Sequence, residues 1–267
     1  LIDHSRFDTY EVSSASFVWK KPFQIPHALW NISRGIWQAY NFLKQRKPQL
    51  VVGFGSYHSC PVLVAAVMLK IPIILHESNV LPGRVNRFFA RWTKTMVITY
   101  AETRRFLKAP ILHLRIPLRG REENTPKADL FKELSLVEGP LTLLVIGGSL
   151  GADYMNQTSI EAIEMLADQG CDLQVIHLCG LRCSADEISE RYRKKGIQAY
   201  VRRFEPRMDV VYRLVDLALI RAGAMTIAEI IEQEIPAIVI PSPSVMENHQ
   251  DMNADPVSYT HLTLPTT

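Results

Sequence analysis

Two separate runs, in which short apolar segments alternate with helical ones, constrain the fold of this chain more than any other feature. The first run begins near residue 49 and predicts strands at 49–54, 71–76, 95–100 and 111–118, with helices at 61–69 and 83–94. Strands that are apolar almost throughout are typical of a parallel sheet covered on both faces. The first run therefore predicts an α/β domain.

The second run follows a charged and polar stretch at residues 120–139, which we interpret as an interdomain linker. Its predicted strands lie at 141–146, 173–179, 198–204, 217–220 and 237–240, and its helices at 152–168, 185–195 and 226–234. The chain is thus predicted to hold two doubly wound parallel-sheet domains, at 1–119 and 140–254, that face a cleft. Residues 255–267 are rich in threonine and proline and continue no predicted element, so we interpret them as a non-native tail.

Composition narrows the class of protein. Of the 267 residues, 47% are hydrophobic and 21% are charged, which suits a globular protein with a core. The net charge of +3 suits anionic substrates or an anionic membrane surface and is too small for a typical nucleic-acid binder. Four cysteines form no disulfide framework and favour a cytoplasmic setting. The longest apolar stretch, 61–75, is too short to span a bilayer.

Two loops that join a strand to a helix are candidate ligand sites. The loop 147–152 (GGSLGA) offers backbone N–H groups and the Ser149 hydroxyl to phosphate oxygens, but it is equally compatible with a tight turn that binds nothing. In the loop 221–229 (RAGAMTIAE), Thr226 and Glu229 have the spacing of a capping box, which is the favoured interpretation of these residues alone. The alternative is that the Glu229 carboxylate binds both hydroxyls of a ribose.

Polar residues also end the predicted strand 71–76. The sequence there, His76-Glu77-Ser78-Asn79, lacks the second histidine of a zinc-protease helix. Asn79 follows the carboxyl end of the strand, where ligands bind in doubly wound folds, so it is a candidate ligand for sugar hydroxyls.

No metal site is predicted. His177, Cys179 and Cys183 are potential ligands, yet no fourth ligand accompanies them, and buried thiols are the commoner explanation. The chain has no Asp-x-Asp pair, which metal-dependent sugar-nucleotide enzymes commonly use to hold a divalent cation. Phosphate is then expected to be neutralised by helix N-termini and arginine.

The predicted helix 83–94 has two faces. Its apolar residues recur at helical spacing and are expected to pack inward: Val85, Phe88, Phe89 and Trp92. Its basic residues form the opposite stripe, which is either a solvated face or a contact with anionic headgroups: Arg84, Arg87, Arg91 and Lys94. A second apolar group either packs on the sheet or faces a membrane: Phe17, Phe23, Ile25, Leu29 and Trp30.

Five motifs, in this order and spacing, resemble the peripheral N-acetylglucosaminyltransferases of peptidoglycan synthesis, the MurG family. They are HESN with PG-x-x-N at 76–86, PLR at 117–119, GGSLGA at 147–152, RAGAMTIAEI at 221–230 and HQDMNA at 249–254. The resemblance covers residues 48–254 and implies a GT-B fold. It implies inverting transfer of N-acetylglucosamine from UDP-N-acetylglucosamine to undecaprenyl-linked lipid I, forming lipid II, with no metal and no cofactor. It further implies a peripheral place on the anionic cytoplasmic face of the bacterial inner membrane.

The resemblance assigns donor-binding residues by motif position. Asn79 and Arg119 are implied as donor contacts from the first domain. Ser149 is implied as the pyrophosphate-loop serine, the backbone at Glu205 as the contact to uracil, and Gln250 as a sugar contact. The nucleoside is implied to lie along Ala224, Met225, Thr226, Ile227, Ala228 and Glu229. Glu229 is then implied to bind the ribose, which reverses the preference for a plain cap.

The chain departs from the family pattern at several points. It has HESN for HEQN, GGSLGA for GGSQGA, Arg-Ala-Gly at 221–223 for Arg-Ser-Gly, and His249-Gln250 for Gln-Gln. Each change could retune a contact without excluding the activity. The family's first glycine-rich loop, with the histidine proposed as general base, would precede Leu1, and the region after Ala254 has no counterpart. We therefore expect no catalytic residue within these 267 residues and no transfer by them alone.

Three alternatives stay open at this point. Another GT-B lipid glycosyltransferase would carry similar nucleotide loops. A sugar-nucleotide epimerase would need acid and base carboxylates in the cleft, and the sequence does not place such a pair. A non-catalytic UDP-sugar-binding protein would lack a glycine-rich loop ending in histidine upstream of Leu1, and this distinguishes it from the enzyme.

Overall fold

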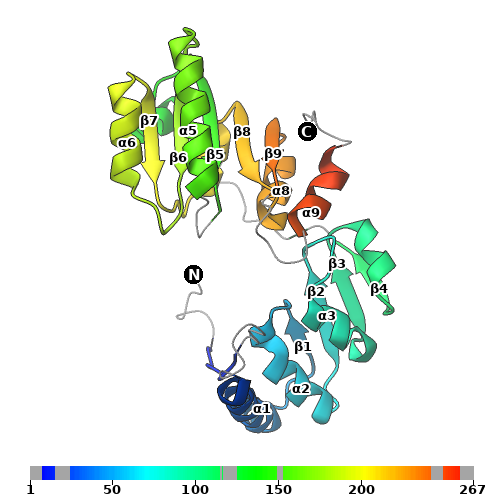
Figure 1. Ribbon diagram of the computed structural model, residues 1–267. Coiled ribbons are helices and arrows are strands. Elements are labelled where there is room, and N and C mark those ends of the chain that lie inside the picture. The colour runs from blue at the N-terminus through cyan, green and yellow to red at the C-terminus, as the bar shows by residue number, and fades with distance from the viewer. Residues whose placement is uncertain are drawn as a thin grey trace. The chain divides into compact units, whose positions relative to one another are not determined.

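The computed structural model describes residues 8–15, 25–114, 116, 125–148, 153–241 and 249–258. The chain separates into two compact units, Leu1–Arg115 and Ile116–Thr267, and each has its own parallel sheet and its own core (Figure 1). The predicted α/β class with two parallel sheets is confirmed. The domain borders proposed at residues 119 and 140 stay a prediction.

The first unit is built on a parallel sheet with the strand order β1-β2-β3-β4. Its strands are β1 (Val51–Gly53), β2 (Ile73–Glu77), β3 (Thr95–Ile98) and β4 (Ile111–His113). Its helices are α1 (Ile25–Arg46), α2 (Cys60–Met68) and α3 (Arg84–Phe89), with the 3-10 turns Tyr57–Ser59, Ala90–Trp92 and Ala101–Phe106. Glu77 pairs with Ile98, so the loops after β2 and β3 lie at the same edge of the sheet.

Helix α1 is the largest element that the sequence pattern did not predict. It packs on α2 through small residues as well as large ones, since Ala28, Gly35, Ala39 and Leu43 are all buried. A Cβ atom at Gly35 would collide with the Ser13 carbonyl, so the chain approaches α1 too closely for any side chain there. Because small residues carry little hydrophobic signal, the helix is not apparent from apolar spacing.

The second unit has the strand order β7-β6-β5-β8-β9. Its strands are β5 (Leu141–Ile146), β6 (Leu173–Leu178), β7 (Gln198–Arg202), β8 (Leu217–Arg221) and β9 (Ala237–Ile240). Its helices are α4 (Lys127–Glu133), α5 (Asp153–Asp168), α6 (Ala185–Lys194), α7 (Met208–Leu214), α8 (Ala224–Glu232) and α9 (His249–Ser258). The strand order reverses beside β5, which pairs with both β6 and β8. Ligands of doubly wound sheets bind beyond the carboxyl ends of the strands at such a switch point.

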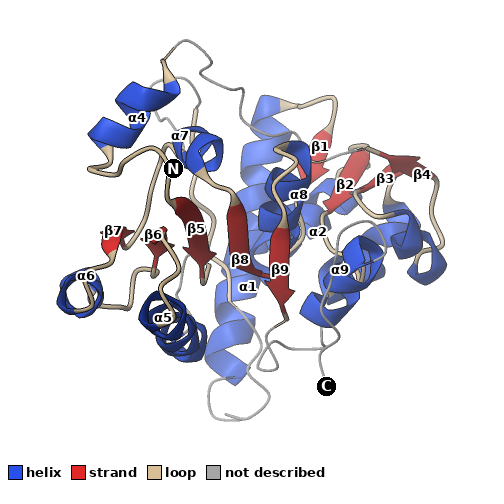
Figure 2. Cartoon of the chain, turned by 90° about the horizontal axis from the view of Figure 1, so that it is seen from above, coloured by secondary structure: helices blue, strands red, loops and turns tan. Residues whose placement is uncertain are grey.

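Helices cover both faces of this second sheet (Figure 2). Helices α5 and α6 lie on one face over a core that includes Ile160, Val175 and Tyr192. Helices α4, α7 and α8 lie on the other face over a core that includes Leu214 and Ile227. All six residues of β6 are buried, the polar Gln174 and His177 among them, as expected for a central strand covered on both faces.

Two segments differ from their sequence-based interpretation. Residues 120–139 contain α4, whose Leu130 and Phe131 are buried in the core of the second unit, so the later part of this stretch is packed structure. Helix α9 extends to Ser258, so the first four residues of the supposed tail continue an element. Residues 259–267 lie outside the described residues.

Candidate functional site

The carboxyl ends of β5 and β8 lie side by side at the switch point. Ile146 pairs with Ile220, and the Arg221 guanidinium donates a hydrogen bond to the Gly147 carbonyl at 3.4 Å. Gly148 has a φ of 87°, a backbone conformation that favours glycine. Burial lowers the pKa of Arg221, and its buried Nε atom has no hydrogen-bond partner among the described residues. The end of β8 thus presents a partly desolvated cation beside the glycine-rich loop.

Helix α8 starts where β8 ends, and its start differs from the capping-box interpretation. The helix begins at Ala224 after Gly223, which makes no side-chain cap, and the Ile227 N–H already bonds to the Gly223 carbonyl. Thr226 is therefore inside the first turn and cannot be the N-cap, so the capping box is wrong. The first N–H groups of an α-helix have no partner within the helix, and α8 starts three residues after the end of β8, so its N-terminus favours an anion there.

Glu229 is fixed by a tyrosine from the neighbouring helix. The Tyr212 hydroxyl of α7 donates to Glu229 Oε2 at 2.6 Å. Tyr212 is buried, and burial together with the nearby Glu229 charge raises the pKa of its phenol far above the usual range. Glu229 itself is half-buried, so part of its carboxylate stays accessible.

The segment 224–229 presents its residues unequally. Ala224 and Ile227 are buried in the core, so only their main chain could reach a ligand. Met225 is exposed, and Thr226 and Ala228 are half-buried. A nucleoside along this segment would therefore meet the accessible residues and the main-chain N–H groups.

The Glu205 side chain forms hydrogen bonds within the loop that follows β7. Its carboxylate accepts hydrogen bonds from the Tyr200 hydroxyl at 2.7 Å and from the Arg207 N–H at 2.9 Å, and its side chain is buried. Burial, and next the hydrogen bond to Glu205, raise the pKa of Tyr200. The carboxylate is thus used inside the loop, and the contact of the Glu205 main chain with uracil stays a prediction.

Helix α9 is attached to the turn before α8. The buried Asn253 side chain donates to the Ala222 carbonyl at 3.2 Å. Gln250 lies three residues earlier on the same helix and is half-buried. This bond keeps the α9 segment that carries Gln250 close to the start of α8.

In the first unit, a buried carboxylate organises the loop after β2. Glu77 accepts hydrogen bonds from the Asn79 N–H at 3.0 Å, the Asn79 side chain at 3.2 Å, the Gly83 N–H at 2.9 Å and the Asn86 side chain at 2.9 Å. The HESN motif predicts Asn79 as the ligand, whereas Glu77 is the residue that shapes the loop. A glutamate directly after an apolar strand, followed by asparagine and glycine donors, is the sequence signal for this role.

Three polar atoms at the same edge are buried without a hydrogen-bond partner among the described residues: His76 Nε2, Asn86 Oδ1 and Thr99 Oγ1. Burial lowers the pKa of His76, against the opposing effect of Glu77. Buried polar groups are rarely left unpaired, so this edge can accept further hydrogen bonds. Two other predicted residues, Arg119 and Ser149, lie outside the described residues.

Helix α3 confirms only half of the predicted inward face. Val85 and Phe89 are buried, but Phe88 is 51% exposed and Trp92 is 43% exposed. The α-helix ends at Phe89 and continues as a 3-10 turn, which changes the angle between successive side chains. The Arg91 guanidinium lies over both exposed rings, 5.1 Å from Phe88 and 5.0 Å from Trp92.

Leu29 and Trp30 of α1 are exposed as well, so packing on the sheet is wrong for these two residues. Phe17 and Phe23, together with the Ile25 side chain, lie outside the described part. Among the helices that the structure describes, none is both long enough and apolar enough to cross a membrane.

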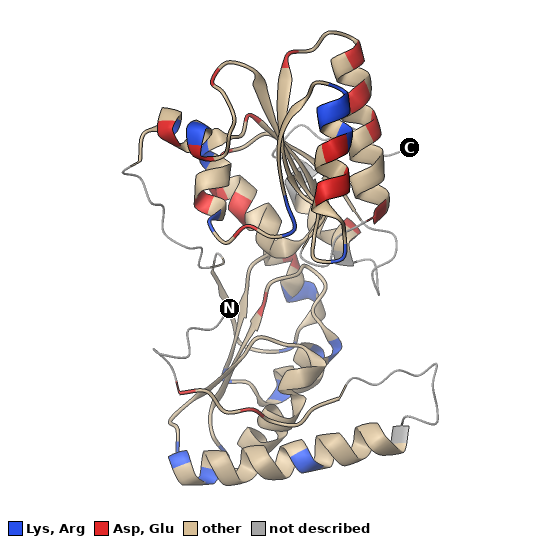
Figure 3. Ribbon diagram, turned by 90° about the vertical axis from the view of Figure 1, so that its left-hand side faces the viewer, with Lys and Arg blue, Asp and Glu red and all other residues tan. Residues whose placement is uncertain are grey.

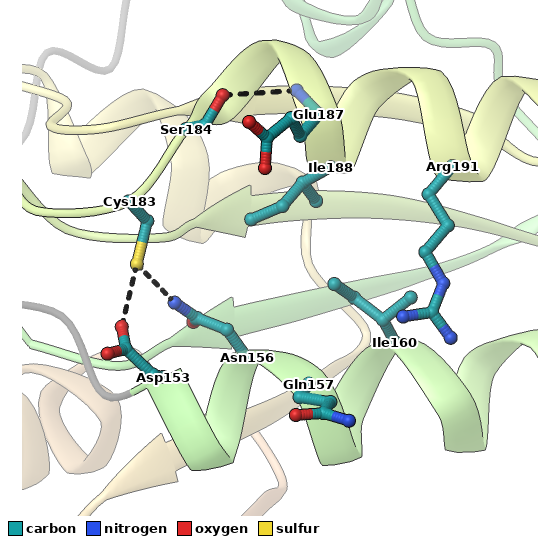
Figure 4. A pocket seen from close by; sticks show the side chains of 9 residues that line it. All are labelled: Asp153, Asn156, Gln157, Ile160, Cys183, Ser184, Glu187, Ile188 and Arg191. Carbon is teal, nitrogen blue, oxygen red and sulfur yellow. Dashed lines mark hydrogen bonds between the residues drawn. The ribbon is translucent and has the colours of Figure 1, made fainter.

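A groove between α5 and α6 is lined by none of the predicted site residues (Figure 4). Within it, the Cys183 thiol lies 3.3 Å from Asp153 and 3.0 Å from the Asn156 amide. Burial, followed by the Asp153 contact, raises the pKa of Cys183, which argues against a reactive thiolate. The groove has a volume of about 380 Å³ and is lined by Asp153, Asn156, Gln157, Ile160, Cys183, Ser184, Glu187, Ile188 and Arg191.

His177 belongs to the core beneath this groove. Its Nδ1 atom lies 2.9 Å from the Tyr192 hydroxyl and its Nε2 atom 3.1 Å from Asn156 Oδ1. Burial lowers the pKa of His177 to about 4. Both ring nitrogens are thus occupied, and within the described part of the chain no group of three His, Cys, Asp or Glu residues is arranged to hold a metal ion.

Comparison with known proteins identifies the family. The glycosyltransferase family 28 N-terminal domain matches residues 3–98, and the C-terminal domain of that family matches residues 142–263. The UDP-N-acetylglucosamine–N-acetylmuramyl-(pentapeptide) pyrophosphoryl-undecaprenol N-acetylglucosamine transferase of Protochlamydia amoebophila is 37% identical over 95% of this chain and 67% of that protein. The protein of the same name from Halothermothrix orenii is 32% identical over 95% of this chain and 71% of its own length.

A solved structure agrees with the sequence comparisons. The crystal structure of Acinetobacter baumannii MurG has a TM-score of 0.69 to this structure at 25% identity, over 95% of this chain and 68% of that one. The predicted GT-B fold class is thereby confirmed. The chain belongs to the family of UDP-N-acetylglucosamine–N-acetylmuramyl-(pentapeptide) pyrophosphoryl-undecaprenol N-acetylglucosamine transferases, the MurG glycosyltransferases.

Proposed function

We propose that this chain serves the transfer of N-acetylglucosamine from UDP-N-acetylglucosamine to undecaprenyl-linked lipid I, giving lipid II. Its second unit supplies the donor site, at the carboxyl ends of β5 and β8. The observation that carries this proposal is that three separate segments meet at one switch point. Arg221 bonds to Gly147, α8 starts beside them, and α9 with Gln250 is hydrogen-bonded to the turn before α8. The names of the relatives supply the identity of the sugar nucleotide and of the acceptor.

Each part of the donor has a chemically suited partner in this proposal. Glu229 accepts hydrogen bonds from the ribose hydroxyls, and the main chain at Glu205 meets the uracil edge. The pyrophosphate lies against Ser149 and the N–H groups that begin α8, because a helix N-terminus stabilises negative charge. Gln250 binds the sugar, and Asn79 and Arg119 are the further donor contacts that the family resemblance implies.

An anionic membrane surface is the partner that we propose for the first unit. Residues 1–115 hold 16 Lys and Arg against 5 Asp and Glu, whereas residues 116–267 hold 14 against 22. Helix α1 carries basic residues and no acidic one (Figure 3). Its exposed Trp30, Arg34 and Trp37 have the i, i+4, i+7 spacing of one helix face. Tryptophan and arginine together are typical of helices that lie at the membrane interface. The cytoplasmic face of the bacterial inner membrane has both the charge and the lipid acceptor that this proposal requires.

Calorimetric titration tests the donor site without requiring turnover. We expect UDP-N-acetylglucosamine to bind in the presence of EDTA and more tightly than UDP-glucose. Glu229→Ala should weaken both ligands by about tenfold or more, because a charged partner of the ribose is lost. Glu232→Ala, which removes an exposed carboxylate from the same helix, is the matched control and should bind like the wild type. Equal affinity for both sugars, or full affinity after Glu229→Ala, would contradict the proposal.

A further inference from the structure

One buried hydroxyl reaches the proposed donor site from outside every motif that the sequence singled out. Tyr212 lies on α7, which follows the loop of Glu205, and its ring is buried in the core with Leu214 and Ile227. Its oxygen lies 2.6 Å from Glu229 Oε2, a length typical of a hydrogen bond to a charged carboxylate. Within the described part of the chain, no other side chain hydrogen-bonds to this carboxylate.

We infer that Tyr212 is a positioning residue for the donor, because it holds the Glu229 carboxylate in the orientation that receives the ribose hydroxyls. The inference rests on the proposed function and deepens it. A tyrosine buried in a packed core has few rotamers, so its hydroxyl is a fixed point, whereas a half-buried glutamate has several accessible rotamers. The phenol occupies about one of the roughly four lone-pair directions of the carboxylate, so the remaining directions can accept both hydroxyls of a vicinal diol.

The hydrogen bond between the two side chains also has a defined direction. The phenol donates and the carboxylate accepts, and burial with the Glu229 charge raises the pKa of Tyr212, so it remains a donor across the physiological range. Glu229 is therefore presented as an acceptor, which is what a ribose requires. Removing the phenol oxygen should leave Glu229 free to rotate, and the ordering of its side chain would then oppose binding.

A two-by-two comparison of protein and ligand tests the inference. The proteins are the wild type and Tyr212→Phe, and the ligands are UDP and its 2′,3′-dideoxy analogue, with dissociation constants from calorimetry. For the wild type we expect UDP to bind about tenfold or more tightly than the dideoxy analogue. For Tyr212→Phe this ratio should fall by about fivefold, since UDP weakens while the analogue, which makes no ribose hydrogen bond, changes little.

The outcomes separate this inference from a merely structural role. If Tyr212 only packs, both ligands weaken equally, the ratio is unchanged and the inference is overturned. Tyr192→Phe is the matched control, because it removes a buried phenol that hydrogen-bonds His177 on the other face of the sheet, and it should keep the wild-type ratio.

If Tyr212→Phe does not fold, Tyr212→4-fluorophenylalanine fills the volume of the tyrosine without donating a hydrogen bond and should show the same reduced ratio. A wild type that binds UDP without discriminating the hydroxyls overturns the ribose assignment of Glu229, and one that does not bind UDP overturns the proposed donor site itself.

Discussion

At the scale of single residues, buried hydrogen bonds to carboxylates and imidazole give this chain its local order. Tyr212 holds Glu229, Tyr200 holds Glu205, and Tyr192 faces His177, each at hydrogen-bond distance. In each pair the phenol oxygen lies 2.6 to 2.9 Å from its partner. A buried polar group is stabilising only when it is paired, so single-atom changes at these sites are expected to be costly.

The lowered pKa of His177 predicts how the free energy of unfolding depends on pH. Its pKa falls from the reference 6.5 to about 4 in the folded chain, so between these values the unfolded state binds a proton that the folded state does not. The contribution of neutral His177 to the free energy of unfolding is therefore complete above pH 6.5 and is lost as the pH falls toward 4. It amounts to about 3 kcal/mol, at roughly 1.4 kcal/mol per pKa unit.

Urea unfolding of the wild type and of His177→Gln at pH 7 and pH 4.5 measures this contribution. The free energy of unfolding of the wild type should fall more between the two pH values than that of the variant. Identical pH dependence in the two proteins would mean that His177 is not held neutral.

At the scale of elements, the loop after β2 depends on Glu77. Glu77→Gln places an amide N–H₂ among groups that all donate, so at least one buried donor loses its acceptor. We expect the free energy of unfolding of the first unit to fall by about 2 kcal/mol, measured by urea denaturation. Glu102→Gln changes an exposed carboxylate of the same unit and should cost less than about 0.5 kcal/mol. Equal effects of the two substitutions would show that Glu77 does not organise the loop.

The strands of both sheets could be predicted from the sequence because short apolar runs such as 141–146 and 237–240 form strands. Helix α1 could not, since small residues form part of its buried face, and α7 could not because it is only seven residues long. The predicted orientation of Trp92 was wrong because regular helical spacing does not extend through the 3-10 turn Ala90–Trp92. Phe88 precedes this turn and is exposed although its spacing is helical.

The loops of the candidate site could be predicted from their glycines and strand ends, but not their internal bonds. Thr226 and Glu229 fit a capping box in sequence, and only the start of α8 at Ala224 excludes it. Tyr212 and Glu229 are 17 residues apart on different helices, so no local pattern connects them. Such partners are set by the packing of α7 against α8.

At the scale of the whole molecule, charge is divided unequally between the two units. Basic residues predominate in residues 1–115, and acidic residues predominate in residues 116–267. An anionic surface should therefore attract the first unit and repel the second, which would orient the protein as it binds.

Binding to vesicles of phosphatidylglycerol tests this orientation. Trp30→Ala combined with Trp37→Ala should lower vesicle affinity by about tenfold, and raising the salt concentration should weaken the wild type further. Tyr154→Ala, which removes an exposed aromatic ring from the second unit, should bind like the wild type. Loss of vesicle binding with Tyr154→Ala but not with the tryptophan variant would contradict the proposed orientation.

The most direct test of the central claim is amide hydrogen exchange with and without UDP-N-acetylglucosamine. The donor site proposed here predicts slower exchange in two segments, 203–208 and 222–230, and unchanged exchange in α6, which borders the α5–α6 groove. Protection confined to the groove of Figure 4, with no change at the start of α8, would contradict it.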